Sequence, residues 1–261
     1  MTPGCPLALR SPKMVRFFEI AFTRRFTQSM TALRLAQWGM PQVPEGRPLV
    51  VLASHAGWWD GVMFMLLHRR LMPGRPCFSP MDAAALGRYG FMRRIGVFGV
   101  EQHSPRGAAQ FLRAAETILA DPWNMLWINA PGRFADPRER PLPLAPGVIR
   151  LAEIAPDAVF LPLAMEYPFW SEAHPEALAA FGPPIEASAL LTHDRDSRAR
   201  LMSAALAETM DRLANDAISR DPARFDTLLQ GRAGMGGVYG GWQYLRALLR
   251  GEKHDPRHGR R

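Results

Sequence analysis

The 261-residue sequence predicts an α/β fold in which a mainly parallel sheet is flanked by helices and preceded by a helical lead-in. Short apolar runs at 49–53, 125–128 and 159–165 are typical of strands that are buried on both faces. Segments with helical spacing of apolar side chains separate these runs, as expected of consecutive βα units. Hydrophobic residues make up 48% of the chain and charged residues 21%, which excludes a disordered chain, a collagen or a coiled coil.

The formal charge of +8 favours an anionic partner, which leaves nucleic acid, an anionic membrane surface and phosphorylated ligands such as coenzyme A open. The two cysteines, Cys5 and Cys77, are too few for a disulfide framework or a four-cysteine zinc site. Neither His-Glu-x-x-His nor Cys-x-x-Cys occurs, so we expect no metal site. Without a secretory signal or a run of 18 apolar residues, we expect a cytoplasmic protein with no transmembrane helix.

The first segment, 1–44, is predicted to be an amphipathic helical region. Residues 11–38 combine an apolar stripe, rich in phenylalanine, with flanking arginines. Such a helix packs on the protein core or lies at a membrane interface, and both alternatives stay open. Prolines at 41, 44 and 48 end it.

The main domain is predicted to span 45–250, with a basic tail at 251–261. Pro162 interrupts the 159–165 strand, and we expect it at a sheet edge or a bulge because it lacks an N–H. The remaining predicted strands lie at 76–79 and 96–100, and the predicted helices at 60–70, 81–94, 106–120, 148–154, 199–219 and, after a glycine-rich loop at 231–241, at 242–250.

His55 follows the 49–53 strand, and Asp60 begins the next helix five residues later. Ligand sites of open α/β sheets lie at the carboxyl ends of strands. A carboxylate that folds back onto one imidazole nitrogen fixes the tautomer and leaves the other nitrogen as a base. The alternative is that Asp60 only stabilises the first helical turn and His55 is an ordinary loop histidine.

Four blocks of the sequence together resemble the PlsC-like glycerolipid acyltransferases, the lysophosphatidic acid acyltransferase superfamily. The stretch from His55 to Asp60 matches that family's His-x-x-x-x-Asp motif, and three later blocks follow in the family's order: Gly96–Gln102, Asn129–Phe134 and Val159–Ala164. The resemblance covers about residues 45 to 170.

The resemblance implies an O-acyltransferase of lipid biosynthesis. The donor would be an acyl thioester of coenzyme A or acyl carrier protein, used as a co-substrate with no further cofactor, and the acceptor a lipid hydroxyl. His55 would be the general base and Asp60 its orienting partner. Backbone amides around Gly132 and the side chain of Arg133 are candidates for stabilising the oxyanion. We expect a peripheral protein on the inner face of the cytoplasmic membrane.

Two departures from the family pattern fall in the acceptor-binding half of the site. Gln102 stands where the family's second motif carries an arginine that binds phosphate, and Pro131 stands where the third carries a glutamate. Gln102 binds a hydroxyl but cannot neutralise a phosphate. We therefore expect a neutral or sugar-bearing lipid acceptor, with Arg106 as partial compensation.

Other side chains leave alternatives open. Trp58 and Trp59 line an acyl channel or pack in the core. Arg133, Arg138 and Arg140 bind substrate phosphates, or form a solvated loop tied by Asp136 and Glu139. Two further alternatives concern the whole protein: a non-catalytic protein that binds acyl chains or acyl carrier protein, and a nucleic-acid-binding protein. Only charge supports the last, since no helix-turn-helix or zinc-finger pattern occurs, and we expect no nucleic acid partner.

Overall fold

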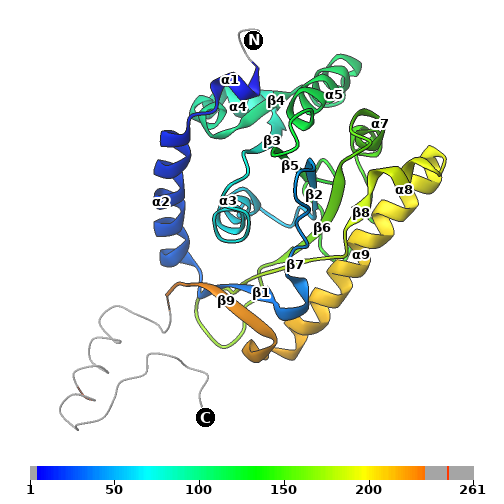
Figure 1. Cartoon of the computed structure of the whole chain (residues 1–261). Coiled ribbons are helices and arrows are strands. Elements are labelled where there is room, and N and C mark those ends of the chain that lie inside the picture. The colour runs from blue at the N-terminus through cyan, green and yellow to red at the C-terminus, as the bar shows by residue number, and fades with distance from the viewer. Residues whose placement is uncertain (1–4, 233–245, 247–261) are drawn as a thin grey trace.

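The computed structural model describes residues 5–232 and Arg246. Its centre is a nine-stranded sheet in the order β4-β3-β5-β2-β6-β7-β1-β9, with β8 paired to β6 (Figure 1). The strands are β1 (Ala32–Ala36), β2 (Leu49–Ala53), β3 (Cys77–Asp82), β4 (Val97–Val100), β5 (Met125–Asn129), β6 (Val159–Glu166), β7 (Ala177–Phe181), β8 (Ile185–Glu186) and β9 (Phe225–Gln230).

The helices join and cover these strands. The α-helices are α1 (Pro6–Leu9), α2 (Pro12–Ser29), α3 (Asp60–Leu71), α4 (Ala83–Arg88), α5 (Pro105–Leu119), α6 (Pro146–Ile149), α7 (Leu151–Ile154), α8 (Ala187–Leu191) and α9 (Arg195–Ser219). Three 3-10 helices, η1 (Gln37–Gly39), η2 (Gly90–Ile95) and η3 (Pro222–Arg224), complete the described part.

Five neighbouring strands, β4, β3, β5, β2 and β6, run parallel, which confirms the predicted mainly parallel α/β fold. β7 and β8 pair antiparallel with β6, and β9 pairs antiparallel with β1. In this register Ala53, the last residue of β2, lies opposite Asn129 of β5 and Leu163 of β6. The carboxyl ends of these central strands therefore meet at one edge of the sheet, here called the carboxyl edge.

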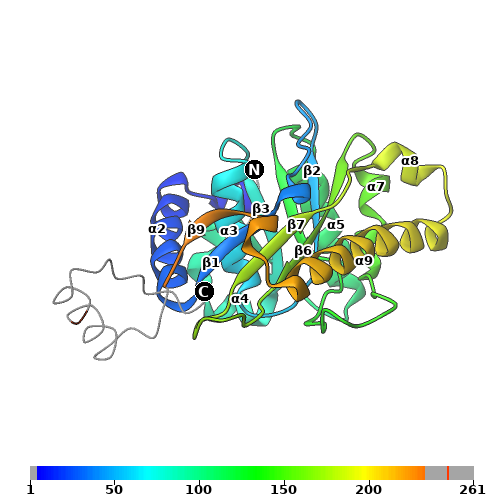
Figure 2. The ribbon, with the colours of Figure 1, turned by 90° about the horizontal axis from the view of Figure 1, so that it is seen from below.

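Alternating side chains of the central strands face two separate cores. Val51, Trp127 and Leu161 belong to the core beneath α2 and α3. Leu52, Leu126 and Phe160 belong to the core on the other face, where α5, α7, α8 and α9 pack (Figure 1). Figure 2 shows α9 along this second side, next to β6. A slip of one residue would exchange the two faces, so the apolar strands hold the register that positions the carboxyl edge.

The predicted helix over 11–38 is too long. α2 ends at Ser29, and residues 32–36 form β1 between β7 and β9. Ala, Leu and Arg favour helices, but backbone pairing with two strands outweighs this local preference. The helical lead-in therefore consists of α1 and α2, and the same segment supplies a strand of the sheet.

The prediction of an edge position for Pro162 is wrong, because β6 lies between β2 and β7. Pairing on the β7 side begins only at Leu163, and β8 pairs with Val159 and Phe160. The Pro162 carbonyl accepts from Gly182 N–H at 2.9 Å on that same side. The missing N–H of Pro162 thus points into the interval between two partner strands, where no ladder bond is lost.

Helix boundaries differ elsewhere as well. The predicted helix over 81–94 is split, because β3 continues to Asp82, whose carboxylate caps α4 by accepting from Ala85 N–H at 3.0 Å, and η2 follows. The strands at 177–181, 185–186 and 225–230 were not predicted. The predicted loop at 231–241, helix at 242–250 and basic tail lie outside the described residues, apart from positions 231, 232 and 246.

Candidate active site

The segment after β2 is clamped onto β6 before it reaches His55. Ser54 is buried, its N–H donates to the Leu163 carbonyl at 3.0 Å, and its Oγ accepts from Met165 N–H at 3.1 Å. A turn then leads into α3, closed by a bond of 3.2 Å from Asp60 N–H to the Gly57 carbonyl. His55 is therefore fixed at the carboxyl edge by backbone bonds on both sides.

Asp60 is fully buried and accepts three hydrogen bonds. Its Oδ2 lies 2.7 Å from His55 Nδ1 and 3.1 Å from Gly57 N, and its Oδ1 accepts from the Tyr167 hydroxyl at 2.6 Å. A buried carboxylate needs such partners, since an unpaired one is very costly. Asp60 thus folds back onto His55 as the spacing predicts, and it also initiates α3.

Tyr167 is the third member of this group. Burial first, and then the neighbouring Asp60 carboxylate, raise the pKa of Tyr167 well above its ordinary value. The phenol therefore stays protonated and serves only as a donor to Asp60. Hydrogen bonds to both of its carboxylate oxygens hold Asp60 in place, and its Oδ2 faces Nδ1 of His55.

The other ring nitrogen of His55, Nε2, is available for chemistry. With Nδ1–H donated to Asp60, Nε2 carries the lone pair. The His55 side chain is 18% exposed, its ring centroid lies 4.3 Å from that of Phe134, and its Nε2 lies 3.4 Å from Asn129 Nδ2. This arrangement can accept a proton from a group that approaches through the carboxyl edge.

The loop after β5 is a tight turn that glycine makes possible. Gly132 has φ +69°, and its N–H donates to the Asn129 carbonyl at 2.9 Å. Ala130 N–H donates to Ala53 O at 2.8 Å, and Ala135 N–H to His55 O at 2.9 Å. The amide of Gly132 itself is thus used inside the turn, which separates it from the other backbone amides expected as oxyanion donors around this residue.

The arginines of this loop are paired within the protein. Arg133 bonds to Glu139 and to the Phe134 carbonyl. Arg138 forms a bidentate ion pair with Asp136, and Arg140 forms an ion pair with Asp211 of α9. The structure therefore matches the alternative of a self-tied loop, and it directs none of the three at His55.

Gln102 and Arg106 share the carboxyl edge but lie away from His55. Both are exposed, Gln102 just after β4 and Arg106 in the first turn of α5. Three strand spacings separate β4 from β2, which is roughly 14 Å. These two side chains do not contact the histidine, and only an extended ligand would reach both places.

Trp58 and Trp59 lie in different environments. Trp59 packs beside the α2–α3 core, with its ring centroid 6.3 Å from that of Phe26. Trp58 is 68% exposed, so the core alternative is wrong for it. Its ring lies at the surface next to the turn that carries His55.

Asn129 was predicted only as the start of the Asn129–Phe134 block and Tyr167 only as part of an acyl pocket or an aromatic edge strand, so their places beside His55 and Asp60 were not predicted. Asn129 is the last residue of β5, and Tyr167 follows the last residue of β6. A position at a strand's carboxyl end was therefore their signal, although the sequence does not reveal that β5 and β6 flank β2.

The Cys77 thiol, the possible metal ligands and the longest helices each bear on the function. Burial raises the pKa of the Cys77 thiol to about 12, so at neutral pH it is not a nucleophile. Among the described residues, no cluster of three or more histidine, cysteine or acidic side chains is arranged to hold a metal ion. None of the helices described there is long and apolar enough to cross a bilayer.

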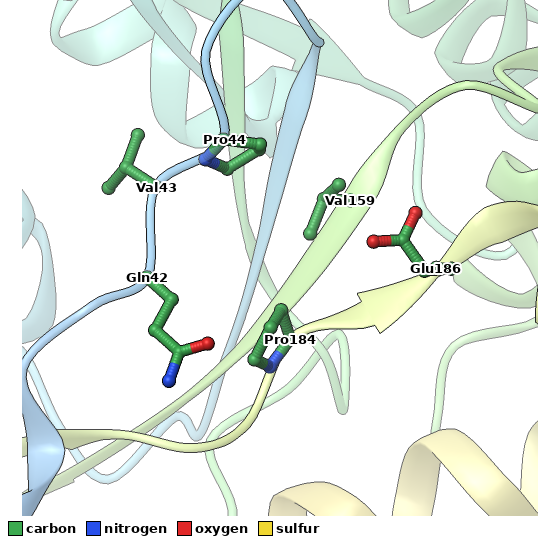
Figure 3. Close-up of a pocket in the computed structure, with 6 residues that line it drawn as sticks. All are labelled: Gln42, Val43, Pro44, Val159, Pro184 and Glu186. Carbon is green, nitrogen blue, oxygen red and sulfur yellow. The ribbon is translucent and has the colours of Figure 1, made fainter.

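An open pocket of about 240 Å³ lies at the other end of the central strands, near the start of β6 (Figure 3). Its lining comes from the segment before β2, from the start of β6 and from the region of β8: Gln42, Val43, Pro44, Val159, Pro184 and Glu186. Val159 begins β6 whereas Tyr167 follows its end, so the length of a strand separates this pocket from the His55 group.

Comparison with known proteins agrees with the geometry. A family model described as Acyltransferase matches residues 36–166, which include His55, Asp60, Asn129 and all three strands that carry the site. A search of curated proteins finds no match. Because the family model covers half of the chain, the protein belongs to the acyltransferase family of the PlsC type.

Proposed function

We propose that this acyltransferase moves a fatty acyl group from an acyl thioester to a lipid hydroxyl, with His55 as the general base. The observation that carries the proposal is the buried Asp60 carboxylate, which contacts His55 Nδ1 at 2.7 Å and leaves Nε2 facing the carboxyl edge. General base catalysis by a positioned histidine contributes roughly 10²–10⁴-fold to a rate.

The reaction needs no covalent acyl-enzyme. The acceptor hydroxyl gives its proton to Nε2 while its oxygen bonds to the thioester carbon, and the carbonyl oxygen becomes an oxyanion. The positive imidazolium is stabilised by Asp60. The oxyanion then collapses, the C–S bond breaks, and the thiolate takes the proton from Nε2.

We expect an acceptor without a phosphate near the reacting hydroxyl. Gln102 is exposed at the carboxyl edge, and the loop arginines are paired with Glu139, Asp136 and Asp211. Gln102→Arg should therefore raise turnover of lysophosphatidic acid relative to a phosphate-free lipid alcohol. Gln110→Arg, farther along α5, is the matched control. An unchanged ratio would remove Gln102 from acceptor selection.

A membrane surface is the expected partner. Phe17 and Ile20 of α2 are each 60% exposed, and Phe18 stacks on Phe91 of η2 at 4.6 Å, which joins the two elements into one face. Exposed cations surround it, with no ion pair to a carboxylate of the described chain: Lys13, Arg16, Arg24, Arg88, Arg93 and Arg94. Exposed apolar side chains with a cationic rim suit an anionic bilayer.

Cosedimentation with vesicles tests this surface. Phe17→Ser with Ile20→Ser should weaken binding to anionic vesicles, because less apolar area enters the bilayer. Ile218→Ser is the matched control, since Ile218 is an exposed apolar side chain on the distant helix α9. Equal binding by all three proteins would reject α2 as the contact.

The reaction itself is tested by release of free thiol from an acyl thioester, with total lipid extract as acceptor and mass spectrometry of the lipids formed. Both coenzyme A and acyl carrier protein donors are supplied. Wild type should release thiol and form a new acylated lipid, and His55→Ala should lose both.

The competing function is binding of acyl chains or acyl carrier protein without turnover, which the changes at Gln102 and Pro131 favour. A stoichiometric lipid complex and no thiol release with either donor would support it. Wild-type turnover by His55→Ala would instead reject His55 as the base.

A further inference from the structure

Asn129 stands beside the reactive nitrogen with an incomplete set of hydrogen bonds. Its Nδ2 lies 3.4 Å from His55 Nε2, longer than an ordinary hydrogen bond, and its Oδ1 is buried with no partner. Buried amide oxygens in folded proteins almost always have a donor. The Asn129 carboxamide is therefore not held by strong hydrogen bonds of the described chain, and its Nδ2 protons remain available to a bound substrate.

The neighbouring backbone strengthens this conclusion. The amides of Ala130, Gly132 and Ala135 all donate to carbonyls of the protein, and position 131 is a proline without an N–H. Arg133 is tied to Glu139. The amides of Ala130, Gly132 and Ala135 and the Arg133 side chain are thus occupied, whereas the Nδ2 protons of Asn129 have only the long contact with Nε2.

We propose that Asn129 Nδ2 donates a hydrogen bond to the oxyanion of the tetrahedral intermediate. This inference rests on the proposed function. A hydroxyl that binds Nε2 displaces the weak Asn129 contact and frees Nδ2. The hydroxyl oxygen and the thioester oxygen become attached to the same carbon, so the oxyanion forms next to the group bound to Nε2, within reach of Nδ2.

In this step Asn129 transfers no proton. The hydroxyl proton passes to Nε2, the electron pair of the C=O bond moves to oxygen, and Nδ2–H binds the negative charge until the C–S bond breaks. The donor is positioned before reaction because β5 pairs with β2, with Asn129 opposite Ala53. Such a donor acts mainly on the transition state and little on substrate binding.

Asn129→Leu tests the proposal, with Asn124→Leu as the matched control. Asn124 precedes the same strand, but its buried Nδ2 donates to the Ile118 carbonyl at 2.9 Å. For Asn129→Leu we expect kcat for thiol release to fall about 10²–10³-fold, with the KM for the thioester within about twofold of wild type. Its melting temperature should not fall, because the buried Oδ1 has no partner to lose.

For Asn124→Leu we expect the reverse pattern: a lower melting temperature and an unchanged kcat of the folded protein. Asn129→Asp keeps the shape but places a carboxylate at the oxyanion, so its loss of kcat should exceed that of the leucine variant. It also decides the question if Asn129→Leu does not fold.

Wild-type kcat in either Asn129 variant, while His55→Ala is inactive, would overturn this inference and leave the proposed function standing. A rise in KM with kcat unchanged would also overturn it, since that pattern reports ground-state binding. Full activity of His55→Ala would instead overturn the proposed function.

Discussion

Helix α3 has a histidine near each end, and the two lie in different surroundings. His55 precedes the helix at the carboxyl edge, where Nδ1 contacts a carboxylate and Nε2 meets only the long Asn129 contact. His68 lies in the last turn, is buried, and its Nε2 donates to the Arg75 carbonyl at 2.6 Å. Burial is the main cause that lowers the pKa of His68.

The polar groups around the two histidines differ in the same way. Near His68, the Arg75 guanidinium donates to the carbonyls of Arg47 and Pro44, and Asn124 to that of Ile118. Near His55, side chains bind one another, and Asn129 is left incomplete. Polar groups completed by backbone carbonyls indicate a structural role, whereas a histidine that is fixed at one ring nitrogen and has only a long contact at the other suits the proposed role of a base.

The largest expected effect of a change around His55, apart from loss of His55 itself, is that of Asp60→Asn. The amide no longer neutralises the imidazolium, so we expect kcat to fall by roughly 10²–10⁴-fold. Steady-state thiol release measures this. Asp216→Asn on α9 is the control, because Asp216 also binds side chains, namely Trp38 and Arg224, but far from His55. A loss of less than tenfold for Asp60→Asn would contradict the assigned role.

Tyr167→Phe should have a smaller effect. It removes one hydrogen bond to a charged group, worth about 1.5–3 kcal/mol, and only part of this is felt in the transition state. We expect a kcat loss of about tenfold with KM unchanged. Tyr89→Phe is the control, since Tyr89 is exposed. Wild-type kcat would show that Gly57 N–H and His55 alone hold Asp60 in place.

Substitution of His68 should affect stability and leave catalysis intact. His68→Leu removes the donor to the Arg75 carbonyl and should cost about 1–3 kcal/mol of unfolding free energy, with kcat unchanged. Because the folded pKa of His68 is lowered, the unfolded chain binds the proton more readily. His68 therefore makes the wild type lose stability as pH falls below its ordinary pKa of 6.5.

Denaturation curves at several pH values from about 7.5 to about 5 measure this. Over this range the free energy of unfolding of His68→Leu should fall less steeply with decreasing pH than that of the wild type. Parallel declines would mean that His68 does not titrate differently on folding. A loss of kcat in the folded variant would remove the distinction between the two histidines.

The smallest expected effect is that of Arg133→Gln. Arg133 is exposed and paired with Glu139, and such surface pairs contribute about 0–1 kcal/mol. We expect kcat and KM within about threefold of wild type. A much larger rise in the KM for the thioester would show that Arg133 leaves Glu139 to bind the donor.

The sequence predicts the local part of the site well. His55 and Asp60 are five residues apart across a strand end, so a short turn is enough to join them. Asn129 and Tyr167 come from other strands, and their place depends on β5 and β6 flanking β2, which no local pattern reveals. The Asn129–Phe134 block marks the loop that contains Gly132, but the sequence does not show that the Gly132 amide is used inside the turn.

The fold follows the same rule. Apolar, β-branched runs such as 49–53 predict buried strands, and helical spacing predicts α5 and α9. Residues 32–36 and 177–181 are rich in alanine and leucine, and they become strands because β1 and β7 pair with each other and with β9 and β6. Pro162 fits a central strand only because of an interval between β7 and β8.

The most direct test of the proposed role of His55 compares His55→Ala with His68→Ala in one assay of thiol release and acyl-lipid formation. We expect folded His55→Ala to lose at least two orders of magnitude in kcat, whereas folded His68→Ala keeps its kcat and melts at a lower temperature than wild type. Wild-type turnover in His55→Ala would contradict the proposal that His55, held by Asp60, is the base.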